Sequence, residues 1–207
     1  AAVATGNGIV WFPPDEYAIS AKLSIDLSKC AVIGNGTRLN STAITSGAAV
    51  HVFSGVAADE HTKWTQNPTH YMDGLAFYTG ATNATTTVAG TYGVEYGHAT
   101  YTNNNDLLIK NCSWRGFDYS LKFLDNSWRC HFVNCAFTNV GNYAIHYTGL
   151  TNSGECMRFD HCYMGTWAQC SDQTSTAGSQ ALLSGDSNWM FTSCSFHSDT
   201  TLDIRGN

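Results

Sequence analysis

The chain has 207 residues, enough for one domain with a sizeable hydrophobic core. Its net charge is −6 and it has only 10 Lys and Arg residues, which argues against nucleic acid or an anionic membrane as a partner. Only 13% of the residues are charged and no apolar run reaches the length of a membrane span, so membrane insertion is not expected. Frequent Gly, Asn, Ser and Thr favour tight turns between short strands over helices.

The first half of the chain predicts short strands separated by turns. Gly6–Asp15 followed by Tyr17–Ser20 predicts a strand, a turn and a second strand, and two further strands are predicted at Leu23–Asp26 and Ala31–Thr37. Fainter strand signals follow at Ala49–Phe53, Gly74–Tyr78 and Tyr92–Tyr96. We expect these to belong to coils that are less regular than those in the second half.

The second half contains four copies of one cysteine-centred pattern. Each copy has an apolar residue three positions before the cysteine and another two positions after it, and the cysteines are Cys112, Cys135, Cys162 and Cys194. The copies are 23, 27 and 32 residues apart. A unit of this size cannot bury its own apolar face, so successive copies must stack on one another. The pattern predicts a solenoid.

Each copy predicts two strands and a turn. The residues before the cysteine alternate apolar and polar, as in a strand with one face inside. The position directly before the cysteine is polar in all four copies (Asn111, Asn134, His161 and Ser193), which predicts a corner where Asn tolerates a left-handed backbone. A second strand follows in each copy, with an inward column of Leu121, Ile145, Leu182 and Leu202. The chain is therefore predicted to be all-β, a single-stranded parallel β-helix.

The chain is expected to be one continuous domain in three zones. The zones are N-terminal strands and a first coil (1–48), irregular early coils with loop insertions (49–105) and regular β-helix coils (106–207). No polar cap is visible at the C-terminal end, where a solenoid normally covers its strand edges. We therefore expect a piece of a longer chain.

Eight cysteines are even in number, so a disulfide framework has to be considered. The four repeated cysteines are instead predicted to stack as small buried hydrophobic side chains that point in parallel. Free thiols of this kind suit a protein that folds in a reducing cytosol. No CxxC or HxxxH cluster occurs, so neither a metal nor another cofactor is predicted.

Several segments resemble one family. Val10–Tyr17 resembles the opening strand of pectate-lyase-like β-helices, and Ile25–Gly36 resembles the next coil of bacteriophage tailspikes. Asp125–Trp128 and Gly149–Glu155 are also similar to tailspike segments. The resemblance implies a right-handed β-helix that forms a homotrimer on a virion tail and folds in the host cytoplasm. It also implies binding and cleavage of a bacterial surface polysaccharide, a capsule or O-antigen, by hydrolase or lyase chemistry.

One acidic residue precedes the strands of each regular coil: Asp106, Asp125, Glu155 and Asp186. Glycosidases need two carboxyl groups about 5–9.5 Å apart, and neighbouring or alternate coils supply such separations. Glu155 and Asp186 are the preferred catalytic pair because they lie on successive coils at nearly matching positions. The alternative is that these acids only shape turns before strands.

A second candidate cluster lies on the outward face of the first strand. Arg158 is predicted to stack over His131, with Asp160 two residues further along, roughly 7 Å away. His131 and Asp160 are candidate catalytic residues, with His131 as a base and Arg158 as the cation that binds a uronate carboxylate. The alternative is an ordinary ion pair on a solvated face.

Substrate-binding residues are predicted at two further places. Lys122 and His146 share an outward column of the second strand, with Asp203 two coils beyond. Tyr163 and Trp167 are candidates for stacking on sugar rings, and Trp167 belongs to the long loop-like insertion Gly165–Gln180. That insertion is equally compatible with a contact between subunits.

Three functions remain open from the sequence. The first is a tailspike depolymerase domain, and the second is a non-catalytic β-helix that binds glycan or forms a fibre segment. The third is a secreted pectinase-like enzyme, which would be expected to carry disulfides and therefore fits the predicted column of free thiols less well.

Overall fold

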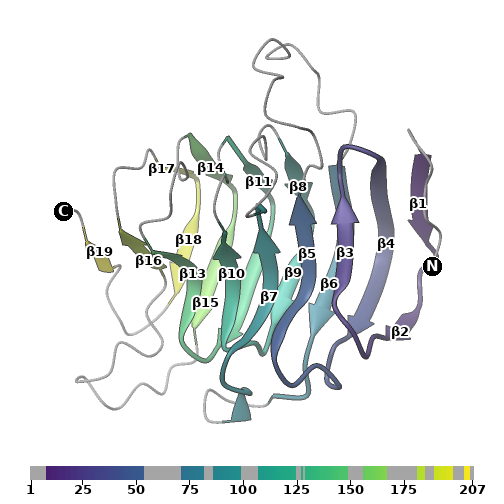
Figure 1. Ribbon diagram of the computed structural model, residues 1–207. Coiled ribbons are helices and arrows are strands. Elements are labelled where there is room, and N and C mark those ends of the chain that lie inside the picture. Colours follow the sequence, from purple (N-terminus) through teal and green to yellow (C-terminus); the bar gives the residue numbers. More distant parts are fainter. Residues whose placement is uncertain are drawn as a thin grey trace.

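The computed structural model describes residues 8–53, 71–81, 86–98, 107–124, 127, 129–148, 156–166, 181–184, 189–197 and 203–205. The regular elements in these ranges are β strands, and every strand pairing between coils is parallel. The strands lie side by side in rows that run from β1 at one end to β19 at the other (Figure 1). The predicted parallel β-helix is confirmed.

The regular coils have three walls, each made of stacked strands. The first wall contains β8 (Leu108–Lys110), β11 (His131–Val133), β14 (Met157–Asp160) and β17 (Trp189–Thr192). The second wall contains β9 (Ser113–Arg115), β12 (Ala136–Val140), β15 (Tyr163–Thr166) and β18 (Ser195–His197). The third wall contains β3 (Leu23–Asp26), β5 (Gly47–Phe53), β7 (Thr91–Tyr96), β10 (Tyr119–Phe123), β13 (Tyr143–Thr148), β16 (Ala181–Ser184) and β19 (Asp203–Arg205).

In the early coils the first two walls are formed by long strands that continue around the corner. β6 (Tyr71–Tyr78) pairs with β8 on the first wall and with β9 on the second. β4 (Cys30–Asn40) pairs with β6 along both walls, and β1 (Gly8–Phe12) and β2 (Glu16–Ala18) pair with its two halves. The predicted early strands are therefore confirmed, and they extend the same walls as the regular coils.

The corner between the first and second walls needs a left-handed backbone in each coil. Asn111, Asn134, His161 and Ser193 have φ values of 52°, 50°, 53° and 52°, so the predicted corner is confirmed. The Asn134 amide nitrogen donates to Asn111 Oδ1 at 2.8 Å, which ties neighbouring corners together. Gly74, with φ 72°, holds the corner of β6. A Cβ on Gly74 would overlap the Gly34 carbonyl oxygen.

Like side chains stack from coil to coil in the core. Phe132, Phe159 and Phe191 form one stack with ring centroids 4.9 and 5.0 Å apart. Phe77, Trp114 and Phe137 form another, at 6.0 and 5.2 Å. Such stacks bury large apolar surfaces and add a specific aromatic contact at each step.

The repeated cysteines lie in the same core. Cys112, Cys135 and Cys162 are each 1% exposed, and all seven described cysteines are free thiols. The Cys135 thiol donates to the Ile109 carbonyl one coil earlier at 3.5 Å. Burial raises the pKa of Cys112 to about 12, so this thiol stays protonated and unreactive at neutral pH.

Two details of the third wall differ from the prediction. Leu182 lies opposite His146, and Ala181 takes the place opposite Ile145, because β16 pairs one residue out of the expected register. The strands also bury two adjacent residues where strict alternation was expected. Ser120 and Leu121 are both fully buried, so the outward residues Tyr119 and Lys122 are three positions apart.

The described part of the chain contains no helix with the length and apolar character needed to cross a bilayer.

Candidate active site

The first wall brings together the three predicted residues His131, Arg158 and Asp160. β11 and β14 pair in the predicted register, so His131 lies opposite Arg158 and Val133 lies opposite Asp160. His131 Nε2 lies 2.7 Å from Asp160 Oδ2, and Arg158 Nε lies 2.8 Å from the same oxygen. The two strands therefore hold one carboxylate between a histidine and an arginine.

The carboxylate of Asp160 is less exposed than the sequence predicted. Its side chain is 10% exposed, against 35% for His131 and 52% for Arg158, because these two longer side chains cover it. The backbone spacing of roughly 7 Å between positions 158 and 160 does not keep the two groups apart, because the side chains bend toward one another. Burial raises the pKa of Asp160, but hydrogen bonds from Arg158, His131 and Thr192 outweigh it and hold the pKa below its ordinary value.

The contact with Asp160 also determines which nitrogen of His131 can act as a base. An ionised carboxylate only accepts hydrogen bonds, so the ring donates through Nε2. The neutral imidazole then carries its lone pair on Nδ1, where it can take a proton from a bound molecule. Arg158 uses Nε for Asp160, and its terminal nitrogens belong to a half-exposed side chain that can reach an anion.

Lys122 and His146 lie on the third wall, away from the His131 cluster. They are opposite each other in β10 and β13, and β16 and β19 continue the same column with Leu182 and Asp203, as predicted for Asp203. Burial, reinforced by Lys122, lowers the pKa of His146, so the ring is neutral at physiological pH. Because β10 and β13 belong to the third wall, Lys122 and His146 are separate from His131 and Arg158 on the first wall.

The remaining predicted residues are elsewhere or outside the described ranges. Tyr163 is on the second wall and is 39% exposed, as a residue that stacks on a sugar must be. Glu155, Asp186 and Trp167 lie outside the residues that the structure describes, as do Asp106 and Asp125. The preferred carboxylate pair stays a prediction.

Comparison with solved structures gives the same fold. The enzymatically active domain of tailspike protein 4 from bacteriophage CBA120 superposes with a TM-score of 0.70 over 93% of this chain and 28% of its own length, at 22% identity. This chain shares the β-helix fold of phage tailspikes. Open reading frame 18 of Geobacillus virus E2 is similar over 95% of the chain and 42% of its own length, with a TM-score of 0.51 and 16% identity.

A sequence relative covers a shorter segment of the chain. An uncharacterised 65.4 kDa protein in the cps region of Klebsiella pneumoniae is 38% identical over 94 residues. The match covers 45% of this chain and 14% of that protein, so the chain spans only a small part of this relative. No protein-family model matches the chain.

The third wall carries an aromatic column that was not predicted from the sequence. Tyr92, Tyr119 and Tyr143 stack with ring centroids 5.1 and 6.0 Å apart. Lys122 Nζ lies 4.3 Å from the centre of the Tyr92 ring, and His146 stacks on Tyr119 at 4.7 Å. The available signal was a tyrosine three residues before Lys122 and another three residues before His146. A spacing of three puts both residues on the same face only because the two residues between them are buried, and the sequence did not indicate this.

The first wall also carries polar groups that the sequence analysis did not select. Lys110 Nζ lies 3.1 Å from Asp73 Oδ2 and 4.6 Å from the centre of the Tyr71 ring. The Asn111 amide nitrogen donates to Asp73 Oδ1 at 2.8 Å. Asp73 belongs to an early coil whose register was not predicted, so no spacing in the sequence placed it beside Lys110.

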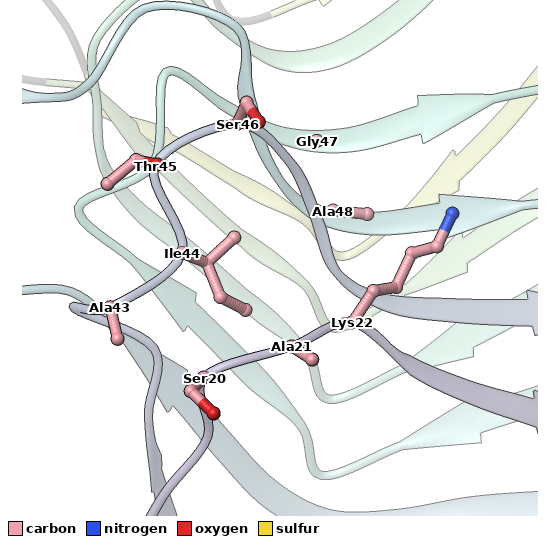
Figure 2. Close-up of a pocket in the computed structure, with 9 residues that line it drawn as sticks. All are labelled: Ser20, Ala21, Lys22, Ala43, Ile44, Thr45, Ser46, Gly47 and Ala48. Atoms are coloured by element: carbon pink, nitrogen blue, oxygen red, sulfur yellow. The ribbon is translucent and has the colours of Figure 1, made fainter.

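Cavities on the described surface include one large and one smaller hollow. The larger, about 690 Å³, lies at the corner beside Asp73, Asn111 and the glycine-rich bend of β4. The smaller, about 290 Å³, is lined by residues 20–22 and 43–48, with Ile44 projecting between the two segments (Figure 2). No group of three metal-ligating side chains is suitably placed among the residues described.

Proposed function

We propose that the chain is part of a phage tailspike-type depolymerase that cleaves a uronate-containing bacterial surface polysaccharide by β-elimination. The single observation that carries this proposal is the cluster in which Asp160 holds both His131 and Arg158. The tailspike fold and the relative from the Klebsiella cps region support a surface polysaccharide as the substrate. In this proposal the whole protein acts as a homotrimer on the virion tail.

The proposed reaction uses the residues of the first wall in distinct roles. Arg158 binds the uronate carboxylate, which makes the hydrogen on the neighbouring C5 more acidic. His131 Nδ1 removes that proton, and the C5–H electrons form a C4=C5 double bond as the C4–O bond breaks. The departing oxygen takes a proton from water. Asp160 orients the imidazole and stabilises the imidazolium that forms.

The rest of the surface suits an extended polymer. Parallel strands repeat about every 4.8 Å along the axis, so each wall offers a regular array of side chains to a repeating chain. Tyr163 on the second wall, and Trp167, Lys122 and His146, are proposed to contact sugars away from the cleavage site. Aromatic rings provide apolar faces for sugar rings, and the polar groups bind hydroxyl or carboxylate groups.

The test incubates the full-length protein with purified capsules from a panel of Klebsiella pneumoniae strains. β-Elimination produces an unsaturated uronate that absorbs ultraviolet light at the new chain end. We expect His131→Ala to slow this reaction by about 10²-fold or more, as loss of a general base does. His161→Asn is the matched control, because it removes a neighbouring histidine and keeps a residue that tolerates the corner conformation.

New reducing ends without ultraviolet absorbance would overturn the elimination mechanism and indicate hydrolysis. Glu155→Gln and Asp186→Asn then test the alternative carboxylate pair, since each should abolish hydrolysis if the pair is catalytic. Capsule binding without cleavage would instead favour the non-catalytic adhesin predicted as an alternative.

A further inference from the structure

The corner between the first and second walls changes its composition along the helix. In the later coils Asn111, Asn134, His161 and Ser193 place a side chain at each corner. In the earlier coil the same position is Gly74, and β4 approaches it through a bend whose register shifts between Ile33 and Thr37. The column of corner side chains therefore ends at Asn111, and the cavity of about 690 Å³ begins there.

Glycine is required on both sides of this hollow. A Cβ on Gly74 would overlap the carbonyl oxygen of Gly34, and a Cβ on Gly34 would lie 2.5 Å from Leu75 Cδ2. Gly36, which also lines the cavity, has φ 73°. The backbone of β4 can approach β6 this closely only without side chains, which leaves peptide groups at the cavity surface.

The polar lining of the cavity is held in place by its neighbours. Asp73 accepts from the Asn111 amide at 2.8 Å and pairs with Lys110 at 3.1 Å, and its side chain is 21% exposed. Arg38, on the other side, pairs with Glu16 at 3.4 Å and lies over the Tyr78 ring at 4.8 Å. The lining therefore presents a fixed carboxylate, an amide and a cation that already has a carboxylate partner.

This cavity lies in line with the candidate active site. Asp73, Lys110, Val133 and Asp160 occupy one column of the first wall, in register from strand to strand. Three strand steps of about 4.8 Å put the cavity about 14 Å from the Asp160 cluster, along the helix axis. A polysaccharide that lies along this wall with one residue at Arg158 extends toward the cavity within a few sugar units.

We propose that the corner cavity is a distal subsite that binds a neutral sugar residue of the polysaccharide cleaved at His131. This inference rests on the proposed function. The charges of the lining are already compensated, Asp73 by Lys110 and Arg38 by Glu16, so the cavity favours a neutral sugar whose hydroxyl groups donate to the Asp73 carboxylate. The Asn111 amide and the exposed peptide groups offer further donors and acceptors to hydroxyls. The substrate class is therefore a mixed polymer, with a uronate at the cleavage site and a neutral sugar several residues away.

The test measures binding without cleavage. Full-length His131→Ala protein is titrated calorimetrically with each capsule of the panel, alone and with Asn111→Gly or Asp73→Asn added. Glycine accepts the corner conformation at position 111, so the first change removes the amide with little effect on the fold. Ser193→Gly is the matched control, because Ser193 has the same backbone conformation but neither lines the cavity nor contacts Asn111.

We expect Asn111→Gly and Asp73→Asn each to weaken binding about fivefold to tenfold, with Ser193→Gly within twofold of the parent. Short fragments that carry the uronate but cannot reach the cavity should bind equally to all variants. Equal binding of the long polymer to all variants would overturn the subsite. The subsite would also be overturned if Asn111→Gly reduced the saturation-transfer signal of a uronate and left the signals of the neutral sugars unchanged.

The outcome also separates the two proposals. If the wild-type protein binds a capsule without cleaving it, β-elimination fails while the variants still decide the subsite. If it binds no capsule in the panel, both proposals fail.

Discussion

At the scale of single residues, one carboxylate organises the candidate active site. Asp160 accepts from His131 and Arg158 through the same oxygen, at 2.7 and 2.8 Å. Half-exposed ion pairs of this kind contribute little stability on their own. Their effect is to restrict the imidazole and the guanidinium to one relative orientation. A fixed orientation of these groups assists a reaction, although it adds little to the stability of the fold.

The lowered pKa of Asp160 predicts a pH-dependent contribution to stability. The carboxylate is favoured in the folded state, so its contribution is complete above its unfolded pKa, near 3.8, and is lost as the pH falls through the lower folded pKa. Asp160→Asn removes this contribution. We expect the difference in unfolding free energy between wild type and variant to shrink as the pH falls from 5 toward 3.

Urea denaturation at a series of pH values measures this difference. Asp118→Asn is a useful comparison, because burial raises the pKa of Asp118. The stability of the wild type relative to Asp118→Asn should therefore rise as the pH falls toward 3. A difference between wild type and Asp160→Asn that grows between pH 5 and pH 3 would contradict the assignment.

At the scale of elements, each short strand is stabilised by the coils on either side of it. β14 is only four residues long, yet Phe159 stacks on Phe132 at 4.9 Å and on Phe191 at 5.0 Å. Strands of this length have little stability alone, and in a solenoid the contacts between neighbouring repeats hold them. The strands that carry His131 and Asp160 are therefore positioned by aromatic contacts beneath them.

Phe159→Ala tests this dependence. Removing a fully buried Phe ring should destabilise the protein by about 3–5 kcal/mol, because apolar burial is lost and a cavity remains between two stacked rings. Phe159→Leu, which retains much of the volume, should cost clearly less. The midpoint of urea denaturation, followed by circular dichroism, distinguishes the two, and equal midpoints would contradict the stacking argument.

At the scale of the whole molecule, three walls separate functions that lie close together in the sequence. His131 and His146 are only 15 residues apart, yet one belongs to the first wall and the other to the third. The same winding puts Asp73 in one column with Asp160 across 87 residues of sequence. Contacts along a wall run parallel to the helix axis, which matches the repeating geometry of a linear polymer.

The complete fold should also protect its thiols. With a pKa of about 12, Cys112 is a thiolate in only about one molecule in ten thousand at pH 8, and its side chain is buried. We expect alkylation of the native protein at pH 8 to label the exposed Cys156 and to leave Cys112, Cys130 and Cys135 unlabelled. Mass spectrometry of peptides, with a urea-denatured sample as control, reads the result. Rapid labelling of Cys135 in the native state would contradict the packed column.

Much of the repeat could be predicted because its local requirements are visible in the sequence. The corner before each cysteine needs a residue that accepts positive φ, and Asn111 and Asn134 satisfy this directly. The pairing of His131 with Arg158 followed from alignment on the cysteines. The register of β16 did not, because a longer stretch of sequence separates it from the preceding strand than in the other coils, and nothing in that sequence specifies a one-residue shift.

The sequence by itself determined the coil, the inward column of the first wall and the left-handed corners, because these depend on periodicity and backbone preference within one repeat. Only the tertiary structure decided that the Asp160 carboxylate lies beneath His131 and Arg158, and that a cavity opens where the corner column ends at Gly74. These features depend on which side chains meet across coils and on how closely two backbones approach. Such distances are set by the packing of the whole solenoid.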